Sequence, residues 1–129
     1  VVMARPLESS GGKISGFDPP NDVASFLPGK PTASLVMLAF LPVRDVVFPI
    51  NLTGSRGVAS VAATASTTFL IKKNGTQVGT MVFAAAGTVA TFTMGSATTV
   101  TTADEITVEA PASPDATLSD VRFTLKATR

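Results

Sequence analysis

The stretch TTFLIKKNGTQVGTMVF, residues 67–83, decides the fold of this 129-residue chain. Two runs rich in β-forming residues flank the pair Asn74 and Gly75. An Asn-Gly pair favours a type I′ turn, because both central residues of that turn need a positive φ. The sequence therefore predicts a β-hairpin with strands over 67–73 and 76–83 and with Asn74 and Gly75 at its turn.

Short apolar or alternating runs lie on both sides of the hairpin. We predict five further strands, over residues 34–40, 45–50, 88–94, 105–109 and 118–125. The continuous apolar run 34–40 is typical of a strand buried on both faces, and Pro49 marks a sheet edge or a strand end. No helical period of useful length is present. The sequence thus predicts an all-β fold, an antiparallel β-sandwich or jelly roll of about seven strands, over residues 32–129.

Residues 1–31 are expected to form an irregular, extended N-terminal arm, because Ser, Gly and Pro interrupt this stretch repeatedly. Ile14, Phe17 and Phe26 are its large apolar residues. Burial of a large apolar side chain contributes about 1.5–3 kcal/mol, so these three are expected to dock somewhere. They dock either on the chain's own domain or on a neighbouring subunit or other protein. Residues 1–31 are thus a candidate docking segment.

The composition argues against several classes of function. The chain has no His, Cys, Trp or Tyr, which leaves carboxylates as the only groups for acid–base chemistry and no imidazole or thiolate for a metal. We expect no enzyme, no catalytic residue, no metal and no cofactor. The net charge of +1 favours no nucleic acid. The longest apolar run, Leu35 to Val43, is far shorter than the ~20 residues of a membrane-spanning helix, so no membrane partner is expected.

Several motifs, taken in order, resemble a family of small β-domains in virion proteins of tailed bacteriophages and prophages. They are FLPGKP at 26–31, KNGT at 73–76, ATF at 90–92, ADEITV at 103–108 and PDATL at 114–118. The family usually has Gly-Asp where this chain has Ala103 and Asp104, so the family's glycine turn is not expected here. The order of strand, Lys-Asn-Gly turn and strand is also loosely similar to the trimeric jelly rolls of complement and tumour-necrosis-factor type.

The resemblance implies a virion structural protein, a tail or head fibre or appendage module that assembles by symmetric protein–protein contacts. The expected partners are further copies of the chain, with a trimer favoured, and other virion proteins; a host surface is a further candidate partner. The expected location is the virion. Two alternatives stay open: a capsid decoration (cement) protein, and a receptor- or carbohydrate-binding module. The second would need exposed aromatic residues, whereas most of the Phe residues occupy inward positions of the predicted strands.

Overall fold

The computed structural model describes residues 18–129, so Ile14 and Phe17 lie outside the described residues. The described residues form three antiparallel sheets of ten strands, and the predicted all-β class is confirmed. The five-stranded sheet contains, in spatial order, β2 (Val36–Phe40), β9 (Ile106–Glu109), β5 (Thr67–Lys73), β6 (Thr76–Phe83) and β7 (Ala90–Met94). The three-stranded sheet contains β1 (Val23–Leu27), β10 (Val121–Leu125) and β4 (Arg56–Val58). The two-stranded sheet pairs β3 (Val46–Phe48) with β8 (Thr98–Val100).

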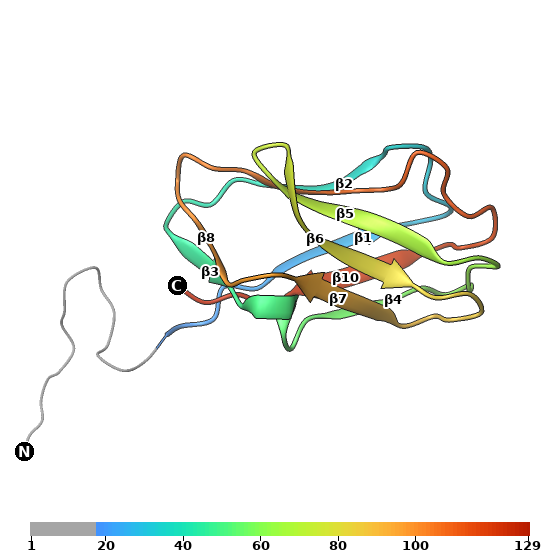
Figure 1. The fold of residues 1–129 in the computed structure, drawn as a ribbon, viewed down its shortest axis with the longest axis horizontal. Coiled ribbons are helices and arrows are strands. Elements are labelled where there is room, and N and C mark those ends of the chain that lie inside the picture. The colour runs from blue at the N-terminus through green and yellow to red at the C-terminus, as the bar shows by residue number, and fades with distance from the viewer. Residues whose placement is uncertain (1–17) are drawn as a thin grey trace, which may run out of the picture.

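The two larger sheets form a sandwich-like pair of layers around one apolar core (Figure 1). Alternation along the strands builds this core: in β10, Val121, Phe123 and Leu125 are buried while the residues between them are exposed. Phe69 of β5 and Phe83 of β6 meet edge to face, with ring centroids 5.9 Å apart. The 3-10 turn η2 (Ile50–Leu52) contributes the buried Leu52 to the same core.

The predicted hairpin forms over its full length. β5 and β6 pair from Thr67 with Phe83 to Lys73 with Thr76, with one register shift after Ile71. Asn74 has φ = 51° and Gly75 has φ = 84°, so both turn residues have the positive φ that the Asn-Gly pair predicts.

The predicted arm needs correction between residues 18 and 31. Residues 23–27, expected to be irregular, form β1, which pairs with β10 over five residues from Val23 with Leu125 to Leu27 with Val121. The alternating sequence VASFL suits a strand, and the flanking prolines that suggested an irregular segment only delimit it. Phe26 is therefore part of the sheet.

Two further expectations about the strands were wrong. The strand count is ten, because β1, β4 and β8 join the seven expected strands. In addition, β2 is not buried on both faces. It is the last strand of its sheet, and its Val36 is 50% exposed. An apolar run indicates that a strand contacts the core, but it does not show whether a second layer covers the other face of the strand.

The two larger sheets also meet at both of their margins. On one side the Ser25 hydroxyl of β1 donates to the carbonyl oxygen of Met37 in β2, at 2.6 Å. On the other side Val58 of β4 forms an isolated antiparallel bridge with Val89, next to β7. Gly57 allows this second approach, because a Cβ at Gly57 would lie only 2.9 Å from the Cβ of Ala90. At these two points the edge strands of one sheet therefore contact the edge of the other sheet.

Candidate functional site

A groove of about 790 Å³ runs over the outer face of the three-stranded sheet. Its walls come from three segments that are far apart in the sequence: β1, the chain from Gly54 to Val58, and the chain from Arg122 to Lys126. The strand register sets the side chains in rows. Phe26, Arg122 and Val58 form one row, and Ala24, Thr124 and Arg56 form the next. All of these face away from the core, because Phe123 and Gly57, their neighbours along the strands, are buried.

Phe26 is the exposed aromatic residue in the lining of this groove. Its side chain is 57% exposed, whereas Phe48, Phe69 and Phe83 are fully buried. The structure therefore places this predicted docking residue on the outer surface of its own domain, beside Arg122. An exposed aromatic residue of this kind offers a contact area to a partner without any rearrangement of the core.

The groove carries an excess of positive charge. Arg56, Arg122 and Lys126 line it, and Asp22 is its single acidic residue. The Arg122 guanidinium is held in place, since its Nη1 donates to the Ser60 hydroxyl and to the carbonyl oxygen of Asp120, both at 3.0 Å. Within residues 18–129, the two ion pairs formed by side chains are Lys72 with Glu109 and Lys73 with Asp104, so none involves a cation of the groove.

Gly54 makes room for one of these cations. A Cβ at Gly54 would lie 2.6 Å from Cδ of Lys126, so the aliphatic part of that side chain lies directly across the glycine. Gly54 also has φ = 90°, a conformation that favours glycine. The Lys126 ammonium is thereby kept at the side of the groove formed by the turn before β4.

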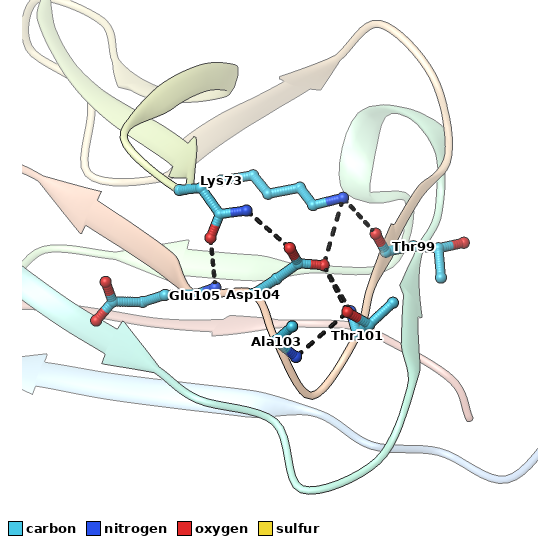
Figure 2. A network of polar contacts seen from close by, with 7 residues as sticks. Lys73, Thr99, Thr101, Ala103, Asp104 and Glu105 are labelled. Carbon is cyan, nitrogen blue, oxygen red and sulfur yellow. Dashed lines mark hydrogen bonds and ion pairs between the residues drawn. The ribbon is translucent and has the colours of Figure 1, made fainter.

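The second predicted site, the hairpin turn, is fastened to the loop between β8 and β9 (Figure 2). The Asn74 side chain donates to Asp104 at 2.7 Å and accepts from the Glu105 amide at 2.9 Å, and the Asn74 amide donates to the Glu105 carbonyl oxygen. Lys73 adds an ion pair to Asp104 at 3.6 Å. Asn74 thus fixes two loops together in addition to making the turn.

Asp104 is a structural carboxylate in this network. It accepts from the Thr101 amide at 2.8 Å and from the Thr101 hydroxyl at 3.0 Å. The Thr101 amide, followed by the Asn74 side chain, lowers the pKa of Asp104 to about 2. Asp104 therefore stays ionised at neutral pH and its oxygens are occupied by protein donors, which suits a loop clamp better than proton transfer.

Asp115 has the same role at the loop before β10. One of its oxygens accepts from the Thr117 hydroxyl and from the amides of Thr117 and Leu118. The other accepts from the Thr64 hydroxyl and from the amides of Thr64 and Ala65. These bonds, led by those from the Thr117 and Thr64 hydroxyls, hold the pKa of Asp115 well below its usual range.

Sequence reasoning singled out Phe26 but missed its cationic neighbours. Arg56 and Arg122 lie 66 positions apart in the chain and come together only because β4 and β10 pair, with Arg122 opposite Val58. No local signal in the sequence could have found that juxtaposition. Within residues 18–129, no group of three or more acidic residues could hold a metal ion, and no helix is long and apolar enough to cross a bilayer.

Comparisons with known proteins return nothing similar to this chain: no family model, no curated protein and no solved structure matches it.

Proposed function

We propose that the chain is a structural module of a bacteriophage virion, part of a tail or head fibre or appendage, which assembles by symmetric contacts with copies of itself and with other virion proteins. The resemblance of residues 26–129 to small virion β-domains is the basis for the virion. The looser similarity to the trimeric jelly rolls of complement and tumour-necrosis-factor type is the basis for the trimer.

The observation that carries the structural role is the contact between the two larger sheets at both of their margins. Ser25 joins β1 to the chain at Met37, and Val58 joins β4 to Val89. Edge strands that already contact the other sheet add a strand from another chain less readily, which favours packing into an assembly without uncontrolled edge-to-edge association. Contacts between subunits then involve the faces and loops of the domain.

The loop between β2 and β3 offers apolar surface for such contacts. Leu41 is 68% exposed and Val43 is 82% exposed. Two large apolar side chains exposed this close together in one loop are a candidate contact for a partner. We propose this loop as part of the contact between subunits.

Light scattering on the purified full chain tests the proposal. We expect a closed oligomer, with a trimer at about three times the 13.1 kDa of the chain. The double variant Leu41→Ser and Val43→Ser should shift the distribution towards monomer. Val89→Ser is the matched control, because Val89 is also 68% exposed but lies in the loop between β6 and β7, at the other end of the molecule (Figure 1).

A chain that remains monomeric at all concentrations would contradict the fibre or appendage role. It would favour the alternative of a capsid decoration protein, whose subunits associate only on the particle. An oligomer that the double variant leaves unchanged would remove the β2–β3 loop from the proposed contact.

A further inference from the structure

We propose that the groove on the outer face of β1, β10 and β4 binds an acidic saccharide. The carboxylate groups of the saccharide would pair with Arg56 and Lys126, and a sugar ring would lie against Phe26. This inference does not depend on the virion role, since it follows from the groove alone.

The excess of cationic side chains in the lining of the groove favours an anionic ligand. Three cationic side chains and one acidic side chain line it, although the whole chain has a net charge of only +1. Asp22 is itself engaged, because its carboxylate accepts from the Ala127 amide at 3.3 Å. Arg56 and Lys126 form no ion pair with an acidic side chain within residues 18–129. An incoming carboxylate would therefore meet cations that need not break an existing ion pair.

The same charge disfavours a second copy of the chain on this face. Two copies that met through this groove would bring six cationic side chains into one interface, against two acidic ones. Like charges that face each other across an interface are repulsive, and burial in the interface would add the cost of desolvation. Self-assembly is thus expected to use other surfaces and to leave this groove accessible.

The sheet geometry favours a saccharide over an acidic peptide. A peptide that binds a sheet usually pairs its backbone with an open strand edge. Here β10 is paired on both sides, and the edge strands β1 and β4 already contact Met37 and Val89 at the edges of the other sheet, so an added strand would have to displace these contacts. The face instead offers the exposed Phe26 ring, on which the apolar face of a sugar ring can lie, and the Thr124 hydroxyl beside it. A few polar groups around an aromatic surface are typical of small-ligand sites.

Titration calorimetry on the full chain tests this proposal. The probes are an oligogalacturonate, a neutral malto-oligosaccharide of the same length and a glutamate peptide of matched charge. We expect binding of the oligogalacturonate that weakens as salt is raised, and binding at least tenfold weaker for the other two probes. Absence of oligogalacturonate binding would overturn the proposal. Equal binding of the glutamate peptide would also overturn it, because it would reveal a general polyanion surface.

Variants locate the binding. Arg56→Gln and Phe26→Ala should each weaken oligogalacturonate binding by on the order of tenfold. Lys30→Gln removes an exposed cation from the loop between β1 and β2, which does not line the groove, and should leave the affinity within about twofold. Each variant is compared with the parent chain by thermal melting, so a lost fold is distinguished from a lost contact. Binding that survives both groove substitutions would place the ligand elsewhere. None of these outcomes depends on the oligomeric state, so they are separable from the test of the virion role.

Discussion

Asp115 connects two segments that are about 50 residues apart in the chain. Its carboxylate receives donors from Thr64 and Ala65 before β5 and from Thr117 and Leu118 before β10. Each of its two oxygens accepts hydrogen bonds from two backbone amides. A side chain that carried an N–H or O–H donor in place of either oxygen would face these amide donors and leave them without an acceptor. These hydrogen bonds explain why the pKa of this loop carboxylate lies below the usual range.

Asp115→Asn should therefore lower the melting temperature by several degrees at pH 7. An asparagine has one acceptor oxygen, so its NH2 group would face amide donors whichever way the side chain is placed. Asp45→Asn is the control, since Asp45 is exposed in the β2–β3 loop and its side chain makes no hydrogen bond within residues 18–129. Differential scanning calorimetry measures both. Equal melting temperatures for the two variants would contradict the clamp.

The pH dependence of stability follows from the same groups. The pKa values of Asp104 and Asp115 are lowered by folding, so their contribution is fully present above the ordinary value of 3.8 and is lost as the pH falls towards 2. We expect a melting temperature that is constant from about pH 7 to pH 5 and falls between pH 4 and pH 2. Asp115→Asn should show a smaller fall over that interval. A fall that is as steep in the variant would assign the acid sensitivity to other groups.

Strands with an apolar or alternating run, such as β2, β9 and β10, were predictable from the sequence although their partners are distant, whereas the short strands β4 and β8 were not. The β5–β6 hairpin could be predicted to the residue, because Asn74 and Gly75 specify the turn between two adjacent strands. β8 could not be predicted, because its sequence Thr-Thr-Val has one large apolar residue within a Thr- and Ser-rich stretch. β4 has the unpromising sequence Arg-Gly-Val, and its glycine is needed because a Cβ there would lie 2.9 Å from the Cβ of Ala90 and 3.3 Å from Met81 and Phe92. Phe26 could be selected as a docking residue, but its cationic neighbours depend on β10 pairing on both sides.

The hairpin turn gives a matched pair of glycine substitutions. Gly75 has φ = 84° and open space where a Cβ would lie, so Gly75→Ala is strained only by its backbone conformation. We expect Gly75→Ala to lower the free energy of unfolding by about 1–2 kcal/mol. Gly95 has equally open space and no positive φ, so Gly95→Ala should be neutral or stabilising by about 0.4–1 kcal/mol. Urea unfolding of both variants tests this; a loss of equal size in both would mean that the turn conformation is not the cause.

At the scale of the whole molecule, both ends of the described chain lie side by side. Asn21 donates to the Ala127 carbonyl oxygen, Arg129 donates to the Pro19 carbonyl oxygen, and Thr128 forms bridges with both Pro20 and Val47. The three-stranded sheet then places β10, close to the end of the chain, between β1 and β4. The first and last elements therefore complete one sheet together, and the domain depends on residues that the sequence assigned to an arm.

Two truncations separate the arm from the domain. Removal of residues 1–17 leaves every strand pairing described above intact, so we expect a cooperative thermal transition close to that of the full chain. Removal of residues 1–30 also deletes β1, which leaves β10 without one partner, exposes the core beside Val23 and removes the Ser25 contact to β2. We expect this shorter chain to melt at least 10 °C lower or to lose its cooperative transition, since it gives up a whole strand of the core. Circular dichroism melts compare the two. If the chain without residues 1–30 melted at the same temperature as the chain without residues 1–17, β1 would be an appendage on a domain that folds without it. The groove beside Phe26 would then be formed by a dispensable segment.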